Sequence, residues 1–282
     1  MRKTSVELSL DDLQFSDAGR ALTTIDGQLR IVEGRLSLES TRSEVAGVPG
    51  RVSLTIDASR DPATVELGLD ASAIDYGALL KSGGVTDGVR GTMALRAKIA
   101  GQGNDLAAVL RGAQGSVEVL GGQGSIRGKL LEVWGGNLMQ ILNPVSWAQG
   151  TDTELNCVAG RFRIAEGVAR SELLLLDSRD VTVAGEFVLN LASEEINGLF
   201  KPQPKQATLV QLSTPLRLSG TLAAPRVRAA DRSVVTLGKL FIGIAQPAAL
   251  ILFFGDLGAK EKDPCAALLA QPIVPATPPA GQ

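Results

Sequence analysis

Apolar and polar residues alternate with a period of two through most of the first hundred residues, as in Arg-Val-Ser-Leu-Thr-Ile-Asp at 51–57. One phrase with this alternation opens and closes on glycine, and it occurs at residues 27–34, 115–122 and 160–167. Successive side chains of a β-strand point to opposite faces of a sheet, and the closing glycine suits the positive φ of a tight turn. The pattern therefore predicts hairpins that each have one apolar face.

Residues 1–103 are predicted to form an antiparallel meander with one polar and one apolar face. Asp-Gly, Glu-Gly, Pro-Gly and Asp-Pro turn signals separate its alternating runs. One short helix is expected inside the meander, over residues 71–81, because the apolar residues there fall on one side at helical spacing. A Gly-Gly pair at 83–84 would end this helix.

Residues 104–232 form a second predicted region, in which helices accompany the strands. Asn104 and Asp105 can cap a short helix that ends at Arg111. A hairpin is expected across residues 116–126, and a helix across 128–142, where apolar residues recur at helical spacing. Further strands are predicted at residues 156–164, 169–176, 181–183, 185–191 and 215–219.

The C-terminal residues lose the alternation. Residues 233–270 are predicted to be a helical segment, and residues 271–282, which are rich in Pro and Ala, a disordered tail. Two interpretations of the helical segment stay open: a helix that caps one end of the sheet, or an amphipathic surface that touches a membrane. The residues that would make the membrane contact are Leu240, Phe241, Phe253 and Phe254.

Composition argues against several kinds of function. Lys and Arg number 28 and Asp and Glu 30, and aromatic residues make up 4%, so no nucleic-acid partner is expected. The chain has no histidine, which removes Ser-His-Asp catalysis and His-ligated metals. Acidic clusters at 11–12, 194–195 and 261–263 are interpreted as solvated loop ends, and Asp177 as a turn residue that caps the backbone. No enzyme activity, cofactor or metal site is expected.

Two further features bear on the cellular compartment. Cys157 and Cys265 are either two small buried apolar residues or one long-range disulfide formed in an oxidising compartment. No secretory signal follows Met1, and the most apolar run, at 237–254, is interrupted by Lys, Gly, Gln and Pro and does not meet the transmembrane criterion. The chain is therefore expected to be a fragment or to have an incorrectly assigned start codon.

The apolar face of so long a meander needs a partner. It can fold into a two-layer sandwich, be covered by helices, or hold an apolar ligand. The predicted helices are too few and too short to cover every strand, and small residues are frequent at inward positions. We therefore predict a mainly β fold with a few short helices, in which an elongated, curved antiparallel sheet forms an open hydrophobic groove. A β-sandwich is the alternative.

Several segments from residue 104 onward resemble the C-terminal region of the AsmA family. These are bacterial envelope proteins related to TamB and to the eukaryotic bridge-like lipid-transfer proteins. The segments occur in the same order as in the family, whereas residues 1–103 resemble the family only in their alternation of apolar and polar residues. They are DLAAVLRGAQGSV at 105–117, IRGKLL at 126–131, LNCV at 155–158, LLLD at 174–177, VAG at 183–185, KPQPK at 201–205, PLRLSGTLAAP at 215–225 and KDPC at 262–265.

The resemblance implies a trough, apolar inside and polar outside, along which phospholipid tails slide between the inner and outer membranes. It implies a periplasmic location with a tether to the inner membrane, and it favours the disulfide between Cys157 and Cys265. The alternative function is a scaffold that assists outer-membrane protein assembly, with envelope assembly proteins as partners. The residues expected to line the groove are Leu29, Ile31, Leu36, Leu38, Val52, Leu54, Ile56, Val65, Leu67, Leu69, Phe162, Ile164, Val181, Val183, Phe187, Leu189, Leu216 and Leu218.

Overall fold

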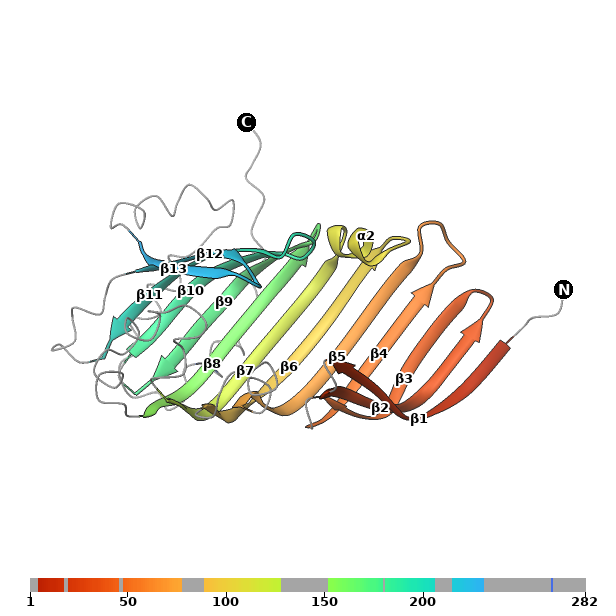
Figure 1. Cartoon of the computed structure of the whole chain (residues 1–282), viewed down its shortest axis with the longest axis horizontal. Coiled ribbons are helices and arrows are strands. Elements are labelled where there is room, and N and C mark those ends of the chain that lie inside the picture. The colour runs from red at the N-terminus through yellow and green to blue at the C-terminus, as the bar shows by residue number, and fades with distance from the viewer. Residues whose placement is uncertain are drawn as a thin grey trace, which may run out of the picture.

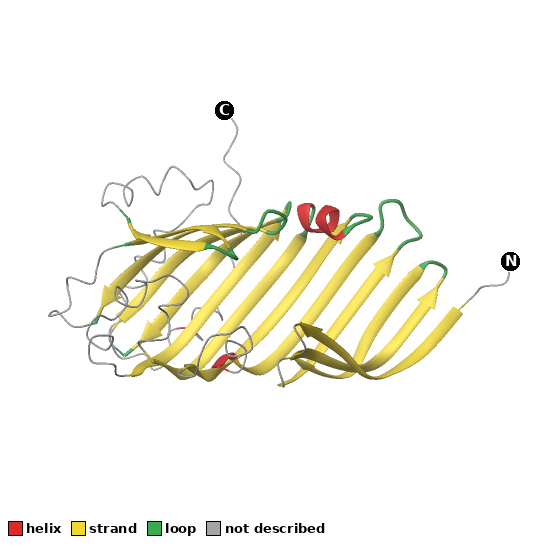
Figure 2. Ribbon diagram, in the orientation of Figure 1, coloured by secondary structure: helices red, strands yellow, loops and turns green. Residues whose placement is uncertain are grey.

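The computed structural model describes residues 5–17, 20–45, 48–77, 89–127, 152–179, 181–205, 215–230 and 265. Nearly all of them lie in strands, and the short helix α2 (Leu106–Arg111) lies beside one row of strand ends (Figure 2). The strands are β1 (Ser5–Asp17), β2 (Arg20–Val32), β3 (Arg35–Val45), β4 (Val48–Asp57), β5 (Thr64–Asp75), β6 (Val89–Gln102), β7 (Gln114–Arg127), β8 (Asp152–Ala165), β9 (Val168–Ser178), β10 (Val181–Asn190), β11 (Glu195–Pro204), β12 (Leu216–Thr221) and β13 (Pro225–Ala229).

All 13 strands belong to one sheet and follow one another in the order of the sequence. Each strand pairs antiparallel with its neighbours in the chain, so the sheet is a continuous meander with β1 and β13 at its edges (Figure 1). The prediction of a mainly β fold with an open antiparallel sheet and few helices is confirmed. The described strands form one sheet rather than the two separate sheets of the sandwich alternative.

The repeated glycine phrase makes a tight turn in two of its three copies. Glu33 and Gly34, between β2 and β3, have φ values of 51° and 82°, and Glu166 and Gly167, between β8 and β9, have 49° and 72°. Two successive residues with positive φ are typical of the type I′ turn, whose twist matches that of paired strands. These two hairpins therefore form where the sequence predicts them.

The third copy does not turn. β7 runs as one strand from Gln114 to Arg127, so the hairpin predicted across residues 116–126 is wrong. Gly121 pairs with Val158 of β8, and the next recorded pairing is between Gly124 and Leu155. The glycines at 121–124 thus lie in a strand whose pairing to β8 continues past them, and a glycine signal alone does not distinguish this from a chain reversal.

The two glycines that turn have different surroundings, which gives a matched pair of substitutions. A Cβ on Gly167 would lie 2.5 Å from the Leu110 carbonyl oxygen and 2.6 Å from that of Arg111, whereas the nearest atom to a Cβ on Gly34 is 3.4 Å away. Gly34→Ala should lower the free energy of unfolding by about 1 kcal/mol, the cost of a left-handed backbone for alanine. Gly167→Ala should cost about 1–3 kcal/mol more, because the α2 backbone must also move. Urea unfolding of both variants tests this, and equal losses would contradict it.

A line of register shifts crosses the N-terminal half of the sheet. Shifts of this kind bend a strand and increase its twist. Each register shift lies beside a shift or an irregular pairing of the neighbouring strand, so the bends occur at one level of the sheet. Figure 1 shows that the strands are curved rather than straight. The shifts lie near residues 10–13 of β1, 25–27 of β2, 39–43 of β3, 71–74 of β5 and 91–93 of β6.

One of these shifts explains why the predicted helix at 71–81 is wrong over its first part. β5 continues through this segment to Asp75. Ala71 and Ile74 are both 1% exposed, and the three-residue spacing across the shift imitates the spacing of a helix face. Tyr76 and Gly77 are helical, and the rest of the predicted helix lies outside the described residues.

The C-terminal half follows the prediction for α2 and for most strands. The Asp105 side chain accepts a hydrogen bond of 2.6 Å from the Ala108 backbone N–H and caps α2 as expected. β11 and β13 were not predicted, because each contains proline and β13 alternates valine with arginine. Of the described helices, none is long and apolar enough to cross a membrane. The predicted helices at 128–142 and 234–254 and the tail at 271–282 lie outside the described residues.

Candidate functional site

One cross-strand row of residues without polar side chains runs the whole width of the sheet. Directly opposed residues of antiparallel strands project from the same face, so successive strand pairings trace the rows on each face. The row that starts at Leu8 in β1 continues through every strand to Pro225 in β13. Its members are Leu8, Leu29, Leu38, Leu54, Leu67, Ile99, Gly115, Ile164, Ala169, Leu189, Ile196, Gly220 and Pro225.

The opposite face carries a row that is polar in all but two strands. Charged neighbours on this face pair with each other: Asp70 lies 4.0 Å from the Arg51 guanidinium and 3.8 Å from that of Arg96. The sheet is therefore amphipathic across all of its strands. The polar row consists of Ser9, Gln28, Glu39, Ser53, Gly68, Lys98, Ser116, Arg163, Arg170, Val188, Asn197, Ser219 and Arg226.

Side chains of the apolar row are more exposed in β1 to β5 than in β8 to β11, with the exception of Leu38 in β3, which is 6% exposed. Leu8 is 48% exposed and Leu67 39%, whereas Ile164 is 4% and Ile196 3% exposed. Exposed apolar side chains that lie side by side mark a surface that binds something apolar more often than scattered ones do. We call the group of exposed and half-buried apolar side chains on this side of β1 to β5 the open apolar face. Its members are Val6, Leu8, Leu10, Leu29, Ile31, Leu36, Val52, Leu54, Ile56, Val65, Leu67 and Leu69.

All 18 residues predicted to line a groove lie on this one side of the sheet, by pairing register and alternation. Ten of them belong to β2–β5, where only Leu38 is buried; the other eight belong to β8–β12, where four are buried and none is exposed. Their contact with lipid stays a prediction. Val6, Leu8 and Leu10 of β1 were missing from the predicted set, although their alternation is visible in the sequence. The four residues predicted to touch a membrane, at 240–254, lie outside the described residues.

Aromatic rings cover the same side of the sheet in its C-terminal half. The rings of Phe162 in β8 and Phe187 in β10 meet edge to face, with centroids 6.2 Å apart. A Cβ on Gly160 would lie 2.9 Å from the Phe162 ring, and one on Gly185 would lie 2.8 Å from the Phe200 ring. Glycine at these positions therefore lets the rings lie close to the backbone, which contributes to the burial seen there.

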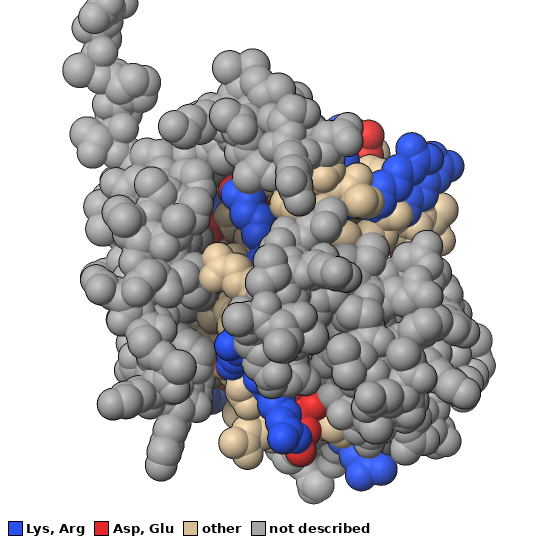
Figure 3. All heavy atoms as spheres, turned by 90° about the vertical axis from the view of Figure 1, so that its left-hand side faces the viewer, with Lys and Arg blue, Asp and Glu red and all other residues tan. Residues whose placement is uncertain are grey.

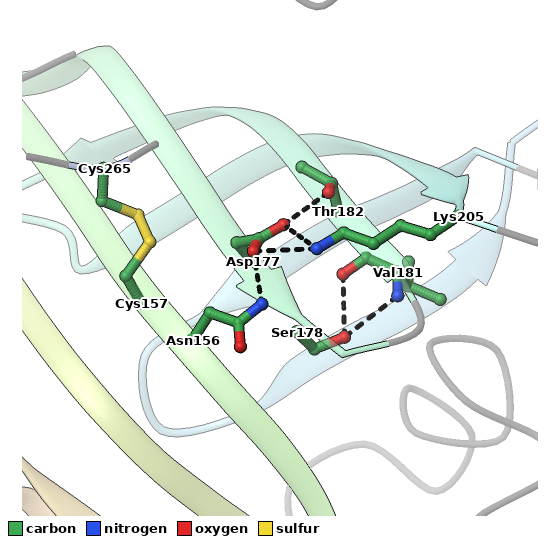
Figure 4. A network of polar contacts seen from close by, with 8 residues as sticks. All are labelled: Asn156, Cys157, Asp177, Ser178, Val181, Thr182, Lys205 and Cys265. Carbon is green, nitrogen blue, oxygen red and sulfur yellow. Dashed lines mark hydrogen bonds and ion pairs between the residues drawn. A yellow bond between two sulfur atoms is a disulfide. The ribbon is translucent and has the colours of Figure 1, made fainter. Parts of the chain in front are cut away.

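Part of the other side of β8 and β9 is apolar as well, and a disulfide joins Cys265 to it. Cys157 in β8 is bonded to Cys265, and both residues are buried, at 1% and 0% exposure (Figure 4). Leu173 and Leu175 of β9 and Ala159 of β8 pack in the same cluster. Register places this cluster opposite the apolar row, so the disulfide does not lie on the candidate site.

A buried carboxylate next to the disulfide corrects one prediction. Asp177 was expected to cap the backbone of a turn, but it lies in β9, is 3% exposed, and binds side chains (Figure 4). It accepts hydrogen bonds from Asn156 at 2.7 Å and Thr182 at 2.6 Å, and it pairs with Lys205 at 2.9 Å. These contacts join β8, β9, β10 and the end of β11. A carboxylate held by three partners stabilises the sheet and has no free oxygen for acid–base chemistry.

Titratable groups with shifted pKa values do not belong to the apolar row. Burial, with the charge of Asp75, raises the pKa of the Tyr76 phenol. Hydrogen bonds from the side chain and backbone of Ser59 lower the pKa of Asp57, which projects from the polar face. Among the described residues, no three His, Cys, Asp or Glu side chains gather to hold a metal ion. What the open apolar face offers chemically is apolar contact.

Comparison with known proteins gives one family and one relative. The model of the AsmA family matches residues 3–174, which contain the whole of the open apolar face. The AsmA family protein YhjG of Escherichia coli (strain K12) is 24% identical over 240 residues, which cover 84% of this chain and 35% of the relative. The chain thus spans about a third of the length of that relative. No solved structure matches the chain.

Proposed function

This chain belongs to the AsmA family, and we propose on that basis that it binds phospholipid acyl chains on its open apolar face and lets them move along the apolar row. The family is linked to biogenesis of the bacterial cell envelope. In this proposal the protein is not an enzyme. Its work is to shield hydrocarbon from water while headgroups remain solvated, in the periplasm between the inner and outer membranes.

The observation that carries the proposal is the unbroken apolar row from Leu8 to Pro225. Burying apolar surface gains roughly 25 cal/mol per Å², whatever the orientation of the chain that covers it. Where its side chains are exposed, a row without polar side chains therefore holds a hydrocarbon tail at several positions with similar free energy. No polar side chain of the row would hold a tail at one position as it moves along, whereas a single pocket would bind the tail in one place.

The shape of the sheet supports the same proposal. The line of register shifts bends neighbouring strands at one level, and a bent amphipathic sheet with its apolar side inward makes a groove. The shifts lie in β1, β2, β3, β5 and β6, and all of these strands except β6 contribute to the open apolar face. This chain would then supply one section of a longer conduit, because it corresponds to about a third of its relative.

Native mass spectrometry of gently purified protein tests the proposal. We expect phospholipid to co-purify with the folded chain and to be released by detergent. A protein that is free of lipid and takes up none from vesicles would overturn the proposal. If such protein instead captured barrel-assembly components in a pull-down, the scaffold alternative would be favoured.

A further inference from the structure

Three arginines gather on the last hairpin of the sheet, β12–β13. Arg217 of β12 and Arg228 of β13 are directly opposite each other, and Arg226 projects from the same face two residues along. All three are exposed. The hairpin has no acidic residue in either strand or in its turn. The sequence hides this cluster, because its basic residues appear scattered until the strand register brings them together.

The cluster is electrostatically unfavourable in the chain by itself. Like charges directly opposite each other on two strands repel and destabilise the pair. Several arginines elsewhere on the polar face have acidic partners. Arg30 lies 2.7 Å from Glu7, and Asp70 pairs with both Arg51 and Arg96. Even where two arginines oppose each other directly, at Arg163 and Arg170, Arg163 pairs with Glu172. Among the described residues, none of the three hairpin arginines forms an ion pair, and the row through Arg217 reaches Glu186 only beyond Leu199. An anion from outside would remove the repulsion.

The turn of the same hairpin is apolar and exposed. Leu222 is 44% exposed, and the alanines at 223 and 224 that follow it are exposed as well. The Leu222 N–H donates to the Glu194 carbonyl at 3.0 Å, and the Ala224 N–H donates to the Thr221 carbonyl at 3.1 Å, so backbone hydrogen bonds hold the turn in place. Of the three arginines, Arg226 is the one next to this turn, which also contacts the exposed Glu194. An apolar turn next to a guanidinium group is typical of a surface that lies at the boundary between lipid headgroups and acyl chains.

We propose that the β12–β13 hairpin docks this end of the protein on a membrane leaflet that contains anionic phospholipids. The arginines would bind phosphate groups, for which the planar guanidinium has matching geometry, and the Leu222 turn would enter the headgroup region. Figure 3 views the molecule from the end at which β13 lies and shows Lys and Arg side chains exposed there among the described residues. The inference rests on the proposed function, because the apolar row ends in this hairpin and docking would join it to a membrane.

Vesicle sedimentation with the full chain tests the inference. The probes are vesicles of phosphatidylcholine alone and of phosphatidylcholine with phosphatidylglycerol, at low and at physiological salt. We expect binding to the anionic vesicles only, weakened by salt. The triple variant Arg217→Gln, Arg226→Gln, Arg228→Gln should bind the anionic vesicles at least about tenfold more weakly, because each basic residue near an anionic surface contributes to binding. The corresponding triple lysine variant keeps the three charges and should retain much of the binding.

The matched control is the triple variant Arg30→Gln, Arg51→Gln, Arg96→Gln, which removes three exposed but paired arginines from the same face and should leave vesicle binding unchanged. Equal binding to the two vesicle types would overturn the inference. So would an equal loss of vesicle binding in the hairpin glutamine variant and in this control, or equally tight binding of the unaltered protein to double-stranded DNA. Lipid that co-purifies with a protein unable to bind vesicles would contradict docking alone. Vesicle binding by a protein that never carries lipid would contradict the proposed function alone.

Discussion

Replacing Leu54 and Leu67 by aspartate should remove most of the phospholipid that we expect to co-purify with this protein. The two leucines are directly opposite each other in β4 and β5, within the open apolar face. Covering one leucine side chain fully contributes on the order of 1.5–3 kcal/mol, and a carboxylate facing a hydrocarbon chain adds a desolvation cost. We therefore expect at least about a tenfold drop in bound phospholipid per folded protein, measured by mass spectrometry.

The matched control places the same charge on the other side of the sheet. Ser53 and Ser116 are exposed members of the polar row, so Ser53→Asp with Ser116→Asp should leave bound lipid unchanged. Leu67→Asp alone is a milder variant, because Leu67 is already 39% exposed and its loss should disturb the fold little. Unchanged lipid in both leucine variants, with circular dichroism showing a folded sheet, would exclude this face as the binding surface.

Of the substitutions proposed for this protein, those that remove the disulfide should lower the free energy of unfolding most. The bond between Cys157 and Cys265 spans 108 residues, and closing a loop of that order stabilises the folded state by about 4–5 kcal/mol through the entropy of the unfolded chain. The double variant Cys157→Ala, Cys265→Ala should therefore lose about this much free energy of unfolding in urea. Treating the unaltered protein with dithiothreitol should produce the same loss.

The position of the disulfide adds a second outcome to that experiment. Because the bond lies on the side opposite the apolar row, protein that remains folded without it should still carry lipid. A loss of stability below about 1 kcal/mol would contradict the prediction that closing this loop stabilises the folded state strongly. Loss of lipid from a folded double variant would show that the two sides of the sheet are not independent.

Strand alternation is the part of this fold that the sequence specifies most directly. The side-chain period of a strand is two, so each apolar run determines which of its residues share a face. Short turns then fix the register between neighbours, as Glu33-Gly34 and Glu166-Gly167 do. The amphipathic sheet follows from these local rules, and this is why all 18 predicted lining residues fall on one side of the sheet.

Errors arise where a local signal has two physical meanings. Ala71 and Ile74 have helical spacing, yet a register shift in β5 produces the same spacing. The glycines at 121–124 resemble a turn but lie within β7. In β11 and β13, prolines removed the strand signal, although proline is compatible with edges and strand ends. In each case the deciding interaction is with a neighbouring strand, which a local pattern does not contain.

Properties that depend on distant contacts were not predictable in the same way. The alternation predicts that Leu67 and Ile164 lie on the same face and does not distinguish their exposure. In the structure Leu67 is 39% exposed and Ile164 is 4% exposed. The burial of Asp177 depends on partners from β8, β10 and the end of β11. The arginine cluster needs the register of β12 against β13. Local alternation therefore assigns a residue to a face, while its exposure and charge environment require the assembled sheet.

The strictly sequential strand order makes the length of this protein adjustable. Since each strand is hydrogen-bonded only to its neighbours in the chain, one hairpin can be added or removed without rearranging the others, as in repeat proteins. Each added hairpin would lengthen the sheet by roughly 10 Å, twice the distance between adjacent strands. Duplication of strand pairs can therefore lengthen such a sheet in regular steps while the existing strands keep their neighbours.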